Sequence, residues 1–86
     1  MHNQRNKLLL ELALIIKKYR NKTTKSISLI SDEIDLSKSI WSDLEKGKKD
    51  PQFITLWRIA EGLNVPLSQI IREIEENTNN SFSFLE

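Results

Sequence analysis

A short stretch near the middle of the chain gathers small polar side chains and one cation at helical spacing. Ser37, Lys38, Ser39 and Ser42 lie within six residues, away from the helical face that carries Trp41 and Leu44. A helix fits the DNA major groove, which is about 12 Å wide, and short polar side chains in its first turn then reach base edges. The chemistry open to these residues is hydrogen bonding to bases, with Lys38 the only cation of that first turn.

A second set of residues could bind phosphate. Ser26 and Ser37 each precede an apolar helical pattern, so each can cap a helix whose free backbone N–H groups attract anions. Lys48 and Lys49 follow Gly47 in a polar loop, where they could reach a nucleic-acid backbone. The alternative for both lysines is that they are solvated loop charges.

Catalysis and metal binding lack a suitable set of residues. The chain has no Cys, and His2 is its single histidine. The carboxylates Asp32, Glu33 and Asp35 are better explained as a solvent-exposed face than as a catalytic pair. Because neither general acid–base nor nucleophilic catalysis has its groups, we expect no enzyme activity, no catalytic residue, no metal site and no cofactor.

Length and hydropathy predict one soluble domain. The chain has 86 residues, 38% of them hydrophobic and 29% charged. Its longest apolar run, residues 12–16, is far below the roughly 20 residues that span a bilayer. No secretory signal pattern is present, so we expect a cytoplasmic protein with no membrane partner.

Apolar spacing predicts an all-α, compact five-helix bundle in one domain over residues 1–76. The expected helices are about 8–20, 27–34, 38–46, 52–63 and 66–76, with residues 1–7 frayed. Gly47 and Asn64 are expected as left-handed terminators. Residues 77–86 are expected to form a polar tail that packs on the core or on a dimer partner. The second and third helices, joined by a tight turn, have the form of a helix-turn-helix.

The formal net charge of +1 hides alternating blocks of opposite charge. Residues 1–26 carry +6, residues 27–45 carry −4, residues 46–58 carry +3 and residues 59–86 carry −4. Two basic blocks therefore flank the proposed reading helix, so one face can be positive while the molecule is nearly neutral.

Some apolar residues exceed what one small core requires. Leu10, Ala13 and Leu14 lie off the main stripe of the first helix and suggest a second buried surface. Trp41 and Trp57 are expected to be core or interface anchors. Either the tail folds back over the core, or the chain forms a homodimer, which we favour because two half-sites about 34 Å apart strengthen binding.

The segment Leu44-Glu45-Lys46-Gly47-Lys48-Lys49-Asp50-Pro51, with Ile59-Ala60 and Leu63-Asn64-Val65 after it, resembles the Cro/repressor-type helix-turn-helix family, also called the xenobiotic-response-element (XRE) family. The resemblance covers roughly residues 12–74. It implies a lambda-repressor-like DNA-binding domain in which the helix from residue 38 lies in the major groove of double-stranded DNA.

The resemblance also implies roles for individual residues. Positions facing base edges or adjacent phosphates correspond to Ser37, Lys38, Ser39, Ser42 and Asp43. Positions gripping the backbone beyond the reading helix correspond to Lys46 and Lys48. Arg20 and Glu45 match a pair that forms an internal salt bridge in some members, which would make Arg20 structural.

Four residues depart from the family pattern. Ile27 stands where Gln is common, and Asp43 stands where a basic or amide side chain is usual. Asp35 replaces a frequent turn Gly. Ile40 replaces a small hydroxyl residue, where it could contact a thymine methyl or widen the core. Asp43 could accept a hydrogen bond from cytosine N4.

We therefore expect a sequence-specific transcriptional regulator, a repressor-type dimer on an inverted repeat. Small free-standing members of the family include prophage repressors, antitoxins and restriction-modification controller proteins, and the sequence is compatible with all three. The alternative is a protein-interaction module on the same scaffold, for example an antitoxin-like partner-binding protein, which Ile27, Ile40 and Asp43 favour.

Overall fold

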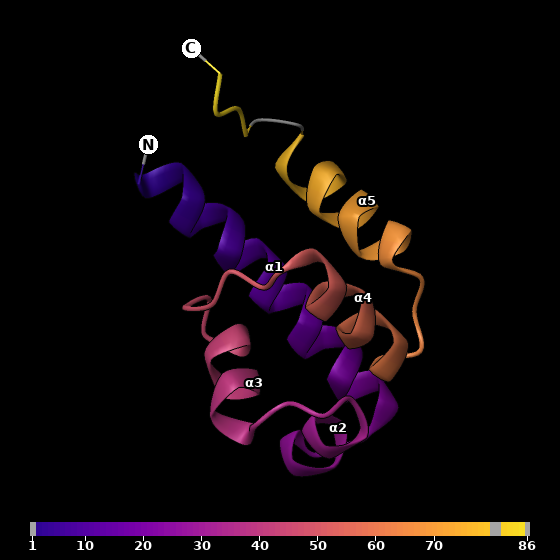
Figure 1. Cartoon of the computed structure of the whole chain (residues 1–86). Coiled ribbons are helices and arrows are strands. Elements are labelled where there is room, and N and C mark those ends of the chain that lie inside the picture. Colours follow the sequence, from indigo (N-terminus) through magenta and orange to yellow (C-terminus); the bar gives the residue numbers. More distant parts are fainter. Residues whose placement is uncertain (1, 80–81, 86) are drawn as a thin grey trace.

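The computed structural model describes residues 2–79 and 82–85 of the chain. Its helices, in order, are α1 (His2–Thr23), α2 (Ile27–Glu33), α3 (Lys38–Glu45), α4 (Phe53–Gly62) and α5 (Leu67–Thr78). No strand occurs among the described residues, and the predicted all-α fold is confirmed. The helices form a single bundle (Figure 1).

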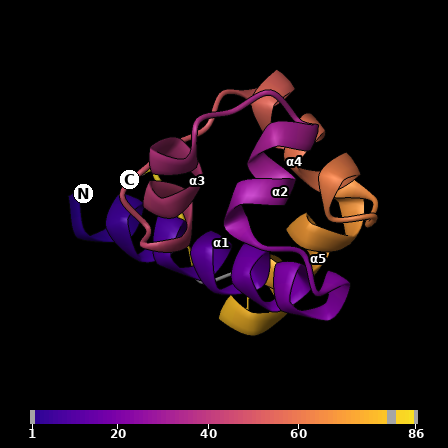
Figure 2. The same ribbon diagram turned by 90° about the horizontal axis from the view of Figure 1, so that it is seen from below.

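The long helix α1 is the support for the rest of the bundle. It crosses the whole molecule, and α3 and α5 both pack against it (Figure 1). Seen from below, α3 lies on one side of α2 while α4 and α5 lie on the other (Figure 2). The helix α3, which the sequence predicts to read bases, thus lies away from the α4–α5 side of the molecule.

The expected start of α1 near residue 8 is wrong, because the helix begins at His2 and ends at Thr23. Gln4, Arg5 and Lys7 are good helix formers, and extending an existing helix avoids the cost of nucleation. Arg5 also forms an exposed ion pair with Asp50, 3.4 Å between nitrogen and oxygen, in the loop before α4.

Residues with left-handed backbone mark the turns between helices. Asp35, Gly47 and Asn64 have φ angles of 59°, 72° and 59°. Gly47 and Asn64 are the two terminators predicted from sequence, and Asp35 adopts the conformation that a turn Gly would have adopted. Thr24, with φ of 60°, ends α1 in the same way.

The remaining boundaries differ from those predicted by one or two residues. Gln52 and Leu63 flank α4 as caps rather than belonging to it. Pro66 precedes α5, which runs on to Thr78 before Asn79 turns left-handed at φ 53°. The ends of α2 and α3 fall one residue earlier than expected, where Ile34 and Lys46 serve as C-caps.

The core is built from apolar residues that recur at helical spacing in all five helices. Its members are Leu12, Ile15, Ile16, Ile30, Ile34, Trp41, Leu44, Ile59, Ala60, Leu63, Ile70 and Ile74. Trp41 is fully buried, whereas Trp57 is 52% exposed and lies on the surface. Within one copy of the chain Ala13 is buried, whereas Leu10 and Leu14 are 50% and 64% exposed, so these two leucines form no second buried surface inside the bundle.

The described part of the C-terminal segment lies beside the N-terminal half of α1. The Ser83 backbone N–H donates to the Gln4 side chain at 3.1 Å, and Phe82 lines a shallow hollow with Leu10 and Asn77. Residues 80, 81 and 86, which the sequence placed in the tail, lie outside the described residues.

We expect Gly62→Ala to destabilise the fold, although Ala is the better helix former. A Cβ at this position would lie 2.8 Å from the Cγ2 methyl of the buried Ile34, so α2 and α4 would have to separate. Overpacking of this kind costs about 1–3 kcal/mol and exceeds the helix-propensity gain of about 1 kcal/mol. Urea unfolding measures the change, and Glu61→Ala on the exposed side of α4 is the control. Equal or greater stability of Gly62→Ala would contradict the close packing.

Candidate nucleic-acid interface

The turn between α2 and α3 sets the angle between these two helices. The Leu36 backbone N–H donates to the carbonyl of Ser31 at 2.8 Å, which bends the chain back after α2. Arg58 of α4 donates to the carbonyl of Ile34 and, at 3.4 Å, to that of Asp35. The guanidinium therefore binds the carbonyl end of α2 and links the turn to α4. In the sequence, Arg58 stands out only as one of the positive charges of residues 46–58.

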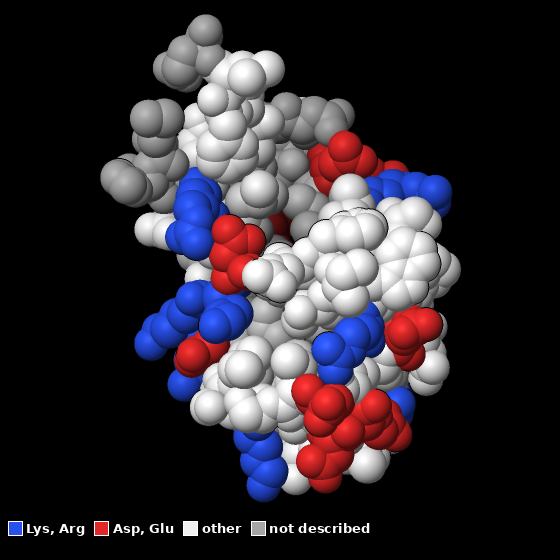
Figure 3. Space-filling model, in the orientation of Figure 1, with Lys and Arg blue, Asp and Glu red and all other residues white. Residues whose placement is uncertain are grey.

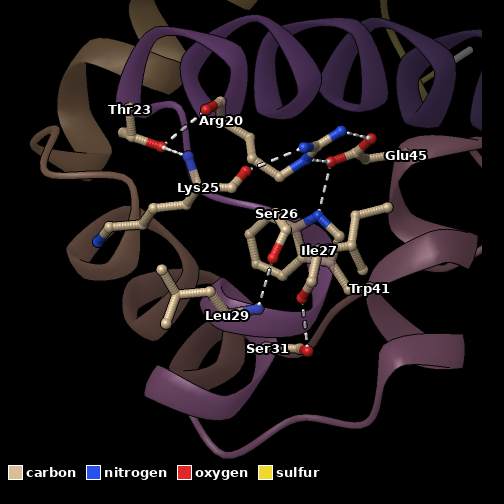
Figure 4. Close-up of polar contacts among 9 residues, drawn as sticks. All are labelled: Arg20, Thr23, Lys25, Ser26, Ile27, Leu29, Ser31, Trp41 and Glu45. Carbon is tan, nitrogen blue, oxygen red and sulfur yellow. Dashed lines mark hydrogen bonds and ion pairs between the residues drawn. The ribbon is translucent and has the colours of Figure 1, made fainter.

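The inner face of α3 is fixed to α1 by apolar packing and by one partly buried ion pair. Trp41 and Leu44 are buried, and the indole Nε1–H of Trp41 donates to Glu45 at 2.6 Å. Arg20 donates to both carboxylate oxygens of Glu45, one of them at 3.0 Å, and also to the carbonyl of Lys25 at 3.1 Å (Figure 4). Arg20 and Glu45 thus form the ion pair that the resemblance implied.

The pKa values of this pair follow from its surroundings. Burial alone would raise the pKa of Glu45, but the hydrogen bonds from Arg20 and Trp41 outweigh it and hold the pKa below its usual value. The hydrogen bond to Glu45 likewise raises the pKa of Arg20 above its ordinary value, against a smaller opposing effect of burial. Both groups stay charged at neutral pH, so the pair orients α3.

The outer face of α3 presents the candidate reading residues to solvent. Ser37, Lys38 and Ser39 are exposed, while Ser42 and Asp43 are half-buried on the same helix. Ile40, one of the departures from the family pattern, is partly buried against the core. The fold therefore brings the hydroxyl groups, one ammonium and one carboxylate onto a single helix whose opposite side is packed against α1.

The two predicted capping serines do cap their helices. The Ser37 hydroxyl oxygen accepts a hydrogen bond from the Ile40 backbone N–H at 3.2 Å, and Ser26 accepts one from Leu29 at 3.0 Å. Each cap satisfies one of the free N–H groups of the first turn and leaves others pointing outward. Ser26 and Ser37 are both exposed.

Three exposed lysines follow α3 in the chain, namely Lys46, Lys48 and Lys49. None of them forms an ion pair with a described residue. The Lys48 backbone N–H donates to the carbonyl of Asp43 at 2.9 Å, so the loop folds back on α3. At Gly47 the backbone approaches Leu10 of α1 so closely that a Cβ would lie 2.7 Å from its Cδ2.

Charge on this side of the molecule is mixed rather than uniformly positive. Figure 3 shows basic side chains along the α3 edge of the molecule and an acidic group over α2.

Among the described residues, no three His, Asp or Glu side chains cluster so that they could hold a metal ion. Over the same residues, no helix is both long enough and apolar enough to span a membrane.

A short α2, a tight left-handed turn and an α3 with a polar outer face define a helix-turn-helix protein. Residues 16–70 match the family described as "Helix-turn-helix" (HTH_3). Because this match covers more than half of the chain, the chain belongs to that family, and the XRE-type resemblance seen in the sequence is confirmed.

Curated proteins with related sequences agree with this assignment. The HTH-type transcriptional regulator SutR of Escherichia coli (strain K12) is 35% identical over 60 residues, which are 70% of this chain and 34% of SutR. The chain thus spans about a third of the length of that relative. Control protein C.MunI of a Mycoplasma species is 34% identical over 62 residues, which are 71% of this chain and 84% of that protein.

Two solved structures share the fold. A point mutant of the restriction-modification controller protein C.Esp1396I superposes with a TM-score of 0.76 at 19% identity, covering 86% of this chain and 94% of that one. An HTH_3 family transcriptional regulator from Vibrio cholerae superposes with a TM-score of 0.77 at 24% identity, covering 93% of this chain and 45% of that one.

We expect Glu45→Gln to lower the free energy of unfolding by about 2 kcal/mol at pH 7, the usual contribution of hydrogen bonds to a charged group. The pKa of Glu45 is lower in the folded than in the unfolded chain, so the unfolded chain binds more protons as the pH falls. The ionic contribution is therefore complete at neutral pH and is lost as the pH falls through the folded pKa. The difference in unfolding free energy between wild type and Glu45→Gln should therefore be smaller at acidic pH than at pH 7.

Urea titrations at pH 7 and near pH 3 measure this difference. Glu73→Gln on α5 is the comparison variant. Hydrogen bonds with Lys18 and Tyr19 also lower the pKa of Glu73, so its stability difference should shrink in the same direction, but by less because this contact lies nearer the surface. A Glu45→Gln difference that is the same at both pH values would show that the charge of Glu45 does not hold α3.

Proposed function

We propose that this chain is a sequence-specific, double-stranded-DNA-binding transcriptional regulator, which reads the major groove with α3. The observation that carries the proposal is the two-sided character of α3. One side is locked to α1 through Trp41, Leu44 and Glu45, and the other side presents the exposed Ser37–Ser39 turn. A rigid helix with short polar side chains at its start is what major-groove reading requires.

In this proposal base edges are contacted by Lys38, Ser39, Ser42 and Asp43. Lys38 is the cation of the first turn, and its exposed side chain can reach the O6 and N7 acceptors of guanine. The hydroxyl groups can donate to or accept from either strand. Asp43, which is half-buried, can accept from the N4 amino group of cytosine.

The phosphate backbone would be contacted by the helix starts at Ser26 and Ser37 and by Lys46, Lys48 and Lys49. The lysines are exposed and lie directly after α3, so they can bind the strand that borders the groove. Phosphate contacts fix orientation without reading sequence, whereas the residues of α3 select the bases.

We further propose a homodimer on an inverted repeat that represses by occupying a promoter. A single reading helix contacts few base pairs, and two half-sites about 34 Å apart let one dimer combine both contributions. The regulator would act in the cytoplasm, on the nucleoid. Its control would come from concentration or from a protein partner. The names of SutR, a transcriptional regulator, and of C.MunI, a control protein, support a regulatory role.

The rival hypothesis is a protein-interaction module with little DNA affinity, and three residues favour it in the sequence. Ile27 and Ile40 are partly buried against the core, so neither forms an exposed apolar docking site. Asp43 alone still favours the rival. The partial burial of Ile27 and Ile40 therefore supports the DNA-binding proposal over the rival.

Selection from pooled random duplexes tests the proposal directly. We expect a half-site motif to be enriched, and we expect log K to fall against log salt with a slope of about −7 if a dimer neutralises roughly eight phosphates. A monomer would give about half that slope. No retention of any duplex at about 50 mM salt would refute DNA binding and favour the protein-interaction module.

Substitution of a base-reading residue should change sequence specificity, whereas substitution of a phosphate-binding residue should change overall affinity. Lys38→Ala should reduce discrimination at one position of the motif by about 1–3 kcal/mol. Lys48→Ala should weaken all sequences alike and reduce the salt slope by about one unit per protomer. Binding of each variant to the motif and to single-base mismatches measures both effects. Lys7→Ala, an exposed lysine on α1, is the control. Retention of motif and affinity by Lys38→Ala would refute its reading role.

A further inference from the structure

The two ends of α3 are held by different parts of the molecule. The last residue of the helix, Glu45, is bound by Arg20 of α1. The first turn of the helix follows a bend in the chain where the carbonyl groups of Ile34 and Asp35 accept hydrogen bonds from Arg58 of α4. Arg58 thus acts on the end of α3 that carries the candidate reading residues.

The helix before this bend has no positive charge of its own at its C-terminal end. α2 has seven residues, about half the length at which an isolated helix becomes even marginally stable in water. Its last turn contains no basic residue and carries Asp32 and Glu33, whose negative charges are unfavourable next to the partial negative charge of a helix C-terminus. The guanidinium of Arg58 supplies the missing positive charge. It also binds the Ile34 carbonyl, one of the terminal groups that have no partner inside the helix.

The turn between α2 and α3 also requires support from its surroundings. Asp35 has a left-handed backbone with φ of 59°, which a residue with a Cβ adopts only at a cost in free energy. Such a conformation persists where neighbouring contacts fix it. One contact is the hydrogen bond from the Leu36 backbone N–H to the Ser31 carbonyl at 2.8 Å, and another is the bond from Arg58 to the Asp35 carbonyl at 3.4 Å. The second bond comes from another helix, so it fixes where the turn lies in the bundle.

The partners of Arg58 are backbone atoms although carboxylates lie nearby. Its side chain is half-buried, and Glu33, Asp35 and Glu61 line the same hollow of about 420 Å³. Arg58 nevertheless forms no ion pair with a described residue. Its guanidinium donates instead to the two carbonyl groups of the turn.

The start of α2 is tied to α4 as well. Lys25, which precedes α2, donates to Glu33 at 2.8 Å and to the carbonyl of Gly62 at 3.1 Å. α4 lies beside α2, on the side away from α3 (Figure 2). α4 therefore holds α2 near both of its ends, and loss of the Arg58 contact would act on the end that leads into α3.

We propose that Arg58 is a positioning residue for base reading. From α4 it fixes the turn and the start of α3, and so sets the angle at which Lys38 and Ser39 meet the bases, without contacting DNA itself. This assignment rests on the proposed function and adds to it a specificity-determining residue outside the helix-turn-helix unit of α2 and α3.

Residual dipolar couplings of the full chain without DNA test whether Arg58 orients α3. In wild type, one alignment frame should fit the N–H bonds of α1 and of residues 36–40. Arg58→Met keeps a long unbranched side chain but removes every donor, so the couplings of residues 36–40 should shrink and leave that frame. Arg58→Lys, which keeps the charge and can still donate to a carbonyl, should restore most of the fit. Couplings that fit the α1 frame equally well in Arg58→Met and in wild type would overturn the assignment.

Binding to the selected duplex tests whether that orientation determines specificity. Circular dichroism first checks that every variant is folded. Arg58→Met should reduce the affinity ratio between the motif and its single-base mismatches by about fivefold to tenfold, because the reading side chains no longer meet the bases at one angle. Arg58→Lys should recover most of this ratio. Lys7→Met, which also removes one positive charge from an exposed helix position, is the control and should leave the ratio unchanged.

The salt dependence of binding distinguishes positioning from a phosphate contact. Arg58→Met should keep the wild-type slope of log K against log salt, whereas Lys48→Ala should lower it. A slope lowered by about one unit per protomer in Arg58→Met would show that Arg58 binds phosphate and would overturn the positioning role. An unchanged ratio between motif and mismatches would show that Arg58 only stabilises the fold.

The outcomes separate this assignment from the proposed function. A wild type that enriches no duplex refutes the regulator, and the dipolar couplings then still decide whether Arg58 fixes the start of α3. A wild type that enriches a motif which Arg58→Met reads equally well leaves the regulator intact and overturns the positioning role.

Discussion

The position of α3 depends on the contact among Arg20, Glu45 and Trp41. Moving a carboxylate out of water costs free energy unless an opposite charge pairs with it and hydrogen-bond donors satisfy its oxygens. Here the guanidinium of α1 binds both oxygens and the indole of α3 binds one of them. The same guanidinium holds the carbonyl of Lys25 just before α2 begins. One arginine thus fixes α1, the start of α2 and the end of α3 relative to one another.

Much of this architecture could be predicted from the sequence because local chemistry determines it. Ser26 and Ser37 cap helices, and Gly47 and Asn64 end them, since each needs only its own backbone and its near neighbours. The core positions of Trp41 and Leu44 followed from helical spacing. The family resemblance implied the Arg20–Glu45 ion pair, and the structure gives its geometry.

What the sequence did not disclose depends on contacts between distant segments. Residues 2–7 are polar and have no apolar stripe, so the sequence pattern did not predict a helix there. Their helical conformation is explained by residues with good helix propensity and by the ion pair between Arg5 and Asp50. Arg58 lies in a basic block, and its bonds to the end of α2 require α4 to be in place. Spacing also could not distinguish the exposed Trp57 from a buried tryptophan, because α4 presents apolar side chains on more than one side.

The close approach of Gly47 to Leu10 has a consequence for binding entropy. The left-handed backbone of Gly47 packs against Leu10 of α1. The backbone N–H of the next residue, Lys48, donates a hydrogen bond to the carbonyl of Asp43. The segment that carries Lys48 is therefore already ordered before any ligand arrives. In the proposed phosphate contacts, only the lysine side chains would then lose conformational freedom on binding, because the backbone that carries them is already held in place. A residue larger than glycine at position 47 would have to displace Leu10 and adopt a strained left-handed backbone, so under the proposed function it would make phosphate binding entropically less favourable.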